Sequence, residues 1–130
     1  MKTYKSFDEF KIYADHLAKK YYFVISKYNE DYSIDVDGNV YLNEQNLNEI
    51  PIQFNIVSLN FYINTNQLKS LEGCPRYVGR NFACYGNFHL RSHEGAHEII
   101  RGDWFINNFI KEDKTPEYQK HLLVKKIEKL

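Results

Sequence analysis

The sequence is short of cysteine, with Cys74 and Cys84 as the only thiols among its 130 residues. Two cysteines do not make a disulfide framework, so the fold is expected to depend on an apolar core and to keep free thiols. Long apolar runs are also missing, because the longest, residues 21–25, is far too short to span a bilayer. The first ten residues hold no apolar segment typical of a secretory signal. We therefore expect a cytoplasmic protein without a membrane span.

Basic residues are absent from one long window, residues 28–68. The same window contains six acidic residues, which are Glu30, Asp31, Asp35, Asp37, Glu44 and Glu49. Between residues 76 and 101 the balance reverses, although the formal net charge of the whole chain is zero. A patch of one sign steers charged partners. The acidic window therefore suits a basic partner, such as the nucleic-acid groove of another protein, and a merely solvated face is the alternative.

Aromatic residues, in contrast, are abundant, with eleven Tyr, nine Phe and one Trp. Tyrosine combines a large apolar ring with a polar tip, which suits a half-exposed binding surface as well as a small core. Hydrophobic residues make up 43% of the chain and charged residues 26%, which excludes a disordered chain. The length then predicts a single domain over residues 1–130.

The first third of the chain predicts a helix, a strand and a hairpin. Ser6 and Glu9 match a capping box, and apolar side chains recur at helical spacing from Phe7 to Leu17. The pattern predicts a helix over residues 7–20, followed by a strand over residues 22–26. Asp37-Gly38 is a turn signal between two apolar alternations, at residues 34–36 and 40–42, and this pattern predicts a hairpin.

The middle of the chain repeats with a step of 21 residues. Residues of similar character recur at this step in three sets, Val40 with Phe61 and Phe82, Leu42 with Ile63 and Cys84, and Asn66 with Asn87. A fourth, partial copy follows at a step of 22, where Val78 aligns with Ile100 and Phe82 with Trp104. Each copy is expected to form one strand, a turn with Asn and a returning arc. Copies of this kind cannot bury their apolar sides alone, so they stack into columns that share one core.

His93, Glu94 and His97 match H-E-x-x-H, the pattern of zinc metallopeptidases. A catalytic site of this type needs a helix, because only then do both imidazoles face one zinc ion. The aligned segment of the preceding copy, residues 71–75, contains Gly73 and Pro75 and is a poor helix former. We therefore expect a non-helical arc, no enzyme and no cofactor. A zinc-dependent hydrolase at His93, Glu94 and His97 is kept as the alternative.

A non-catalytic metal site is a second alternative reading of the same region. Its candidate ligands are Cys74, Cys84, His89, His93 and His97. Their spacings match no compact zinc finger, and the alignment of Cys84 with Ile63 indicates a core residue instead.

The C-terminal segment predicts a second helix over residues 115–130, with Thr115 as N-cap and Pro116 in the first turn. Its apolar stripe is expected to cap the end of the stack. The predicted fold is therefore α+β, with a helix and strand cap over 1–36, a leucine-rich-repeat-like β stack of three to four turns over 37–110, and the capping helix.

One stretch of the sequence resembles a known family. Residues 68–79, LKSLEGCPRYVG, followed by NFACYGN at 81–87, resemble the short leucine-rich-repeat-like proteins of phage and prophage genomes. The match covers about residues 38–106, but the first copy lacks the L-E-G-x-P turn and the last replaces Leu and Pro with His. The resemblance implies an accessory protein of a mobile element in a bacterium, and it carries over no catalytic residues.

These observations predict a protein-binding module, most concretely an inhibitor of a bacterial defence system of the anti-CRISPR type. Its partner would be a bacterial protein with a basic surface, for example a CRISPR effector nuclease, so nucleic acid would be contacted only indirectly. The predicted contact residues are Asp35, Asp37, Tyr41, Glu44, Tyr62 and Tyr85, with the tyrosines in a near-column at steps of 21 and 23. Packing of these tyrosines under a flanking helix is the alternative. A rival function is direct nucleic-acid binding, through Arg76, Arg80, Arg91, Arg101 and the Lys-rich C-terminal helix.

Overall fold

The computed structural model describes residues 2–90, 99–100, 102–105, 123–124 and 126–129. Its helix, α1 (Phe7–Tyr21), begins where the sequence predicts, because the side chain of Ser6 accepts a hydrogen bond of 3.1 Å from the backbone N–H of Glu9. It ends at Tyr22, whose left-handed backbone lets the N–H of Phe23 close the last turn on the carbonyl of Ala18. The predicted helix over residues 7–20 is therefore confirmed to within one residue.

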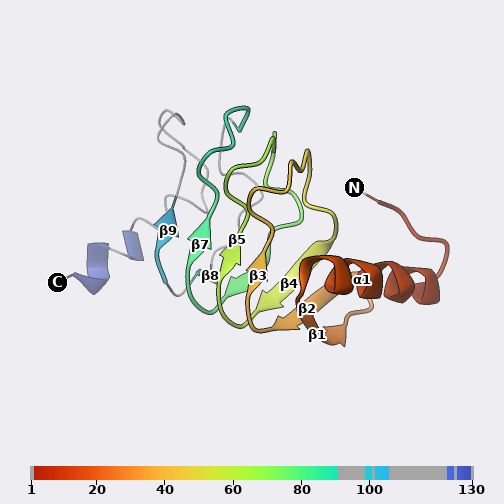
Figure 1. Ribbon diagram of the computed structural model, residues 1–130. Helices are drawn as coiled ribbons and strands as arrows, with labels where there is room; N and C mark the ends of the chain where they lie inside the picture. Colours follow the sequence, from red (N-terminus) through yellow and green to blue (C-terminus); the bar gives the residue numbers. More distant parts are fainter. Residues whose placement is uncertain (1, 91–98, 101, 106–122, 125, 130) are drawn as a thin grey trace.

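In the described part of the chain, nine short strands form two sheets that extend away from this helix (Figure 1). Sheet A has the order β1-β2-β4-β6-β8, and sheet B has the order β3-β5-β7-β9. The strands of sheet A are β1 (Val24–Tyr28), β2 (Ser33–Asp37), β4 (Gln53–Val57), β6 (Tyr77–Val78) and β8 (Ile99–Ile100). Those of sheet B are β3 (Val40–Tyr41), β5 (Phe61–Tyr62), β7 (Phe82–Ala83) and β9 (Trp104–Phe105). All neighbours pair in parallel except β1 and β2. The fold class is thus α+β, as predicted.

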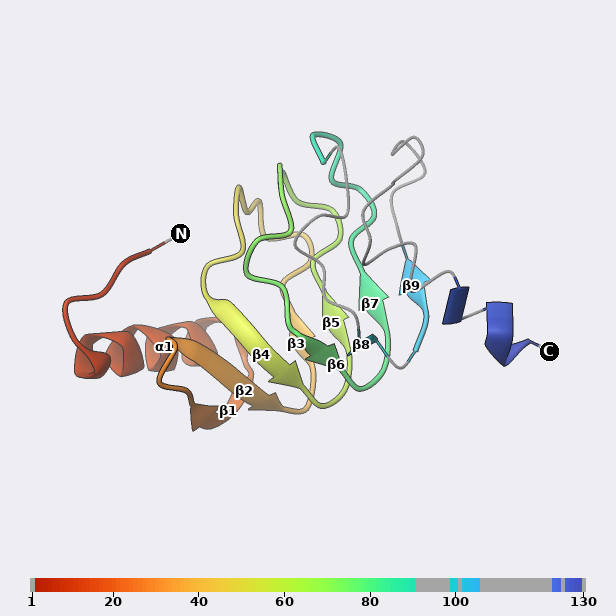
Figure 2. The ribbon, with the colours of Figure 1, turned by 180° about the vertical axis from the view of Figure 1, so that it is seen from behind.

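The pairing follows the residue steps seen in the sequence. In sheet B, Val40 pairs with Phe61 and Phe61 with Phe82, and the step of 22 then places Phe82 beside Trp104. In sheet A, Val57 pairs with Val78 and Val78 with Ile100. Successive repeats therefore lie side by side, and the chain passes from sheet A to sheet B in each of them (Figure 2).

Two details of the predicted repeat are wrong. Each repeat contributes two strands rather than one, because segments such as Gln53–Val57 also pair with their neighbours in a second sheet. Asp37-Gly38 is not a hairpin turn, since β2 and β3 belong to different sheets and the turn instead forms the corner between them. The hairpin of this fold lies one strand earlier, where β1 pairs antiparallel with β2.

The core fills the space between the two sheets and is closed at one end by α1. Phe54 of sheet A meets Phe61 of sheet B edge-on with ring centroids 5.1 Å apart, and Phe61 stacks on Phe82 at 6.0 Å. The helix buries Phe10, Ala14 and Leu17 in the same cluster. The hydroxyl of Tyr13 donates to the carbonyl of Pro51 at 3.0 Å, which ties the helix to the first repeat.

Two sequence predictions fall mainly or wholly outside the described residues. Of the C-terminal helix predicted over residues 115–130, the structure describes helical backbone at 123–124 and 126–128. The non-helical arc predicted at His93 and His97 lies outside the described segments. Within the described part of the chain, no helix has the length and apolarity that crossing a membrane requires.

Candidate functional site

Two tyrosines lie in register on the outer face of sheet B, the side that points away from the core. Tyr41 pairs with Tyr62 across β3 and β5, and their ring centroids are 5.3 Å apart. Their strand neighbours Val40, Leu42 and Phe61 are fully buried, so the tyrosines project outward by the alternation of a strand. Tyr41 is 47% exposed, so no described element covers it. We call this surface, centred on Tyr41 and Tyr62, the tyrosine face.

The third predicted tyrosine does not continue this pair in register. Ala83, which is buried, occupies the position next to Tyr62 on β7. Tyr85 lies two residues further along, beyond the end of the strand, and is 46% exposed. The predicted near-column of Tyr41, Tyr62 and Tyr85 is therefore wrong in its last member, because the step of 23 matches no pairing between β5 and β7.

The predicted acidic contacts are divided between two sheets. Asp35 and Asp37 belong to β2 of sheet A, whereas Tyr41 and Tyr62 belong to sheet B. Asp37 is exposed at the corner that leads into β3, and Glu44 is exposed three residues after that strand. Asp37 and Glu44 therefore precede and follow the first strand of the tyrosine face, but Asp35 lies on the outer face of the other sheet.

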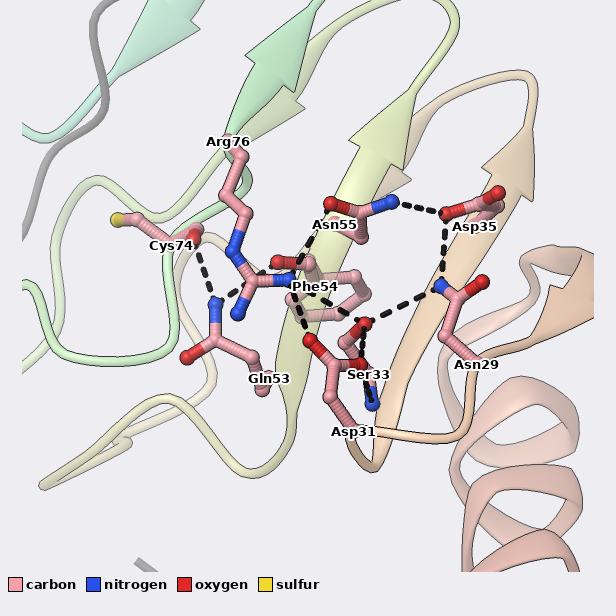
Figure 3. A network of polar contacts seen from close by, with 9 residues as sticks. All are labelled: Asn29, Asp31, Ser33, Asp35, Gln53, Phe54, Asn55, Cys74 and Arg76. Atoms are coloured by element: carbon pink, nitrogen blue, oxygen red, sulfur yellow. Dashed lines mark hydrogen bonds and ion pairs between the residues drawn. The ribbon is translucent and has the colours of Figure 1, made fainter.

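Asp35 is half-buried and held by side-chain amides (Figure 3). One of its carboxylate oxygens accepts hydrogen bonds from Asn55 at 2.8 Å and from Asn29 at 3.0 Å. Arg76 extends across β4 and donates from Nη1 to Asn55 at 3.2 Å and to Asp31 at 3.0 Å. These contacts join neighbouring strands of sheet A, so Asp35 has a structural role, and its role as a contact residue stays a prediction.

The pKa of Asp31 lies below its ordinary value, chiefly because the hydroxyl of Ser33 donates to its carboxylate, and also because of the neighbouring Arg76. A lowered pKa stabilises the fold above the ordinary pKa of about 4, and this contribution is lost as the pH falls through the lowered value. At pH 6 we expect Asp31→Asn to lower the free energy of unfolding by no more than about 1 kcal/mol, because the pair is exposed.

The free energies of unfolding of the wild type and Asp31→Asn should approach each other as the pH falls below about 4 and through the lowered pKa of Asp31, because its carboxylate then becomes protonated in the folded protein too. Urea unfolding followed by circular dichroism between pH 6 and pH 3 measures this. Glu72→Gln is a suitable control, because Glu72 is exposed and forms no ion pair with another residue of the described segments. A difference between wild type and Asp31→Asn that stays constant over the whole pH range would contradict the assignment.

The cysteines are placed as core residues rather than metal ligands. Cys74 and Cys84 are both fully buried and unbonded to each other, and burial raises the pKa of the Cys74 thiol well above its ordinary value. A thiol held protonated is a poor ligand, because metals bind the thiolate. His89 is exposed, and His93 and His97 lie outside the described residues. Among the residues that the structure describes, no group of three potential ligands is close enough to hold a metal ion.

Asparagines form two ladders along the stack, and the repeat step in the sequence predicted part of one. The predicted pair Asn66 and Asn87 is buried, and each side chain bonds backbone groups of its own and a neighbouring repeat. A second ladder runs along the corner between the sheets, where the N–H of each residue donates to the side-chain oxygen of the one before, through Asn39, Asn60, Asn81 and Asp103. This second ladder could have been found in the sequence, because its members follow one another at the same steps, 21 and finally 22.

The structure thus offers an outward pair of tyrosines in ring contact and exposed carboxylates before and after the first strand of that face. Comparisons of the chain with protein-family models, with curated proteins and with solved structures found no match in any of the three.

Proposed function

We propose that this chain is a protein-binding module and that its contact surface is the tyrosine face. The observation that carries the proposal is the in-register pair of Tyr41 and Tyr62 on the outside of a regular parallel sheet. The pair is already held by the fold, so little side-chain freedom is lost when a partner covers it. Tyrosines of this kind are enriched among the residues that dominate binding energy in protein interfaces.

We further propose that the partner presents a basic surface. Asp37 and Glu44 are exposed before and after the first strand of the tyrosine face, and no lysine or arginine occurs in residues 28–68. A basic, nucleic-acid-binding surface of a bacterial protein matches this charge. Together with the leucine-rich-repeat-like resemblance, this supports an inhibitor of a bacterial defence system of the anti-CRISPR type, acting in the cytoplasm on a target such as a CRISPR effector nuclease. The role is binding, not catalysis.

Direct nucleic-acid binding receives less support from the described residues. Arg76, one of its predicted contacts, is engaged by Asp31 and Asn55. An arginine paired with a carboxylate contributes little attraction for phosphate.

The double substitution Tyr41→Ala with Tyr62→Ala should reduce capture of the partner at least about tenfold, because tyrosine hot spots cost more than 1.4 kcal/mol each when truncated. The measurement is capture by the immobilised chain from a lysate of a bacterium that expresses an RNA-guided nuclease, with the captured protein quantified by mass spectrometry. In the same bacterium, expression of the wild-type chain should restore phage plating, and expression of the double variant should not.

The control for this experiment is Tyr22→Ala, which removes an exposed tyrosine at the end of α1 and leaves both sheets intact. This variant should capture the partner and restore plating as the wild type does. Equal capture by the wild type and the double variant, with both folded by circular dichroism, would exclude the tyrosine face as the contact surface.

A further inference from the structure

A recess lies beside the tyrosine face, at the bends that follow β3 and β5 and near the bend that follows β7. Its volume is about 340 Å³, near the lower end of the range for ligand pockets, about 300–1,000 Å³. The bends stand side by side along one edge of the stack (Figures 1 and 2). The lining residues come from three successive repeats and are Glu44, Asn46, Thr65, Asn66, Gln67, Gly86 and Phe88. We call this site the corner recess.

Left-handed backbone lines the corner recess. Glu44, Thr65 and Gly86 stand at steps of 21 and have φ angles of 57°, 58° and 75°. The N–H of Glu44 donates to the carbonyl of Asn64, and that of Thr65 donates to the carbonyl of Tyr85, so the three bends are joined into one surface. A Cβ on Gly86 would lie 3.0–3.1 Å from Thr65, which means that the two bends are packed closely.

Thr65 is the unusual residue of the three. A β-branched residue with positive φ is a rare outlier, and such conformations cost about 1–3 kcal/mol. Glycine, which the next repeat has at Gly86, would avoid the strain. Strained residues of this kind collect at ligand-binding sites, where the side chain is needed for contact. This observation is independent of the shape of the corner recess and also indicates a binding site.

The lining is suited to a cation that donates several hydrogen bonds. Among the described residues that line it, Glu44 is the one charged residue, and none is a lysine, arginine or histidine. Asn46, Thr65 and Gln67 are exposed and offer amide and hydroxyl oxygens beside that carboxylate. Phe88, which is 62% exposed, adds an aromatic ring. A divalent metal would need more carboxylates than the single one present.

We infer that the corner recess takes the guanidinium group of an arginine side chain from the partner protein. A guanidinium is planar and carries five N–H donors, so it can donate to the Glu44 carboxylate and to neutral oxygens at once and can stack on an aromatic ring. The inference rests on the proposed function, because it names the contact that a basic partner surface would make next to the tyrosine face.

The test uses the isolated chain and N-acetyl-arginine-amide, followed by two-dimensional ¹H–¹⁵N NMR. Addition of this probe should produce saturable shifts of the amides of Glu44, Thr65 and Gly86, with millimolar affinity. Glu44→Gln should weaken the binding at least about tenfold, as expected for loss of a charge-assisted hydrogen bond. Glu30→Gln, which alters an exposed carboxyl outside the lining, should leave the affinity unchanged.

Several outcomes would overturn the inference. These are the absence of saturable shifts, an unchanged affinity in Glu44→Gln, equal binding of N-acetyl-lysine-amide, and the same shifts with the uncharged N-acetyl-norleucine-amide. If the probe does not bind while partner capture still depends on Tyr41 and Tyr62, the corner recess is not an arginine site, but the proposed function is unaffected. Binding of the arginine probe with no capture dependence on the tyrosines would instead remove the tyrosine face.

Discussion

Replacement of Gly79 by alanine is expected to lower the free energy of unfolding by at least about 3 kcal/mol, the upper end of the range for overpacking. A Cβ at this position would lie 1.9 Å from the carbonyl oxygen of Ser58, a backbone atom of the neighbouring repeat. Neither backbone segment can easily move away, because the N–H of Gly79 donates to the carbonyl of Val57 and the N–H of Ser58 donates to the carbonyl of Val36. Relief of the overlap would therefore break bonds that hold three repeats together.

Urea unfolding of Gly79→Ala, followed by circular dichroism, measures this effect. Gly38→Ala is the matched control, because it makes the same substitution at another corner, where no atom lies within 4 Å of the added Cβ. Its cost comes only from the φ of 110° at Gly38 and should be about 1–2 kcal/mol. A loss in Gly79→Ala no larger than that in Gly38→Ala would mean that the repeats are not packed as closely as the structure places them.

Asn66→Ala is the second substitution for which we expect a large effect, a loss of about 3 kcal/mol. The side-chain oxygen of Asn66 accepts from the N–H groups of Leu47 and Gln45, at 3.0 and 3.1 Å. Its amide donates to the carbonyls of Leu42 at 2.8 Å and Ile63 at 3.1 Å. Alanine removes every one of these bonds, and backbone groups left without a partner in a buried place cost about 1–3 kcal/mol each.

Thermal and urea unfolding of Asn66→Ala should be compared with Asn48→Ala, an exposed asparagine nearby that has no side-chain hydrogen bond within the described segments. Asn48→Ala should change stability by less than about 0.5 kcal/mol, as is usual for surface substitutions. If the two variants were equally stable, water would be replacing the amide of Asn66, and this ladder would not hold the bends together.

The step of 21 residues predicted the register of sheet B and of β4 with β6 in sheet A, because stacked repeats must place equivalent side chains in one column. Val40, Phe61 and Phe82 pair as the step requires, and the inserted residue before the last copy shifts the pairing to Trp104. The cap at Ser6 and the helix after it were also predictable, because both depend on residues only a few positions apart.

Features that join distant parts of the chain could not be predicted in the same way. The ion pair between Arg76 and Asp31 joins residues 45 positions apart and follows no step of the repeat. The sequence predicted Asp35 as a surface carboxylate, because its hydrogen-bond donor Asn55 lies 20 residues away and no local pattern indicates the contact. The corner recess was missed for a different reason, since the left-handed backbone of Thr65 opposes its intrinsic preference.

The corner ladder of Asn39, Asn60 and Asn81 has an evolutionary consequence. The side-chain oxygen of each asparagine accepts from the N–H of the residue one step later, so each rung joins equivalent positions of adjacent repeats. Duplication or loss of one whole repeat would preserve the rungs, and the last rung, from Asn81 to Asp103, is kept even across a step of 22. Descendants of this gene should therefore differ in length by multiples of about 21 codons, and a longer version would add strands to both sheets and leave the helix at its first end unaltered.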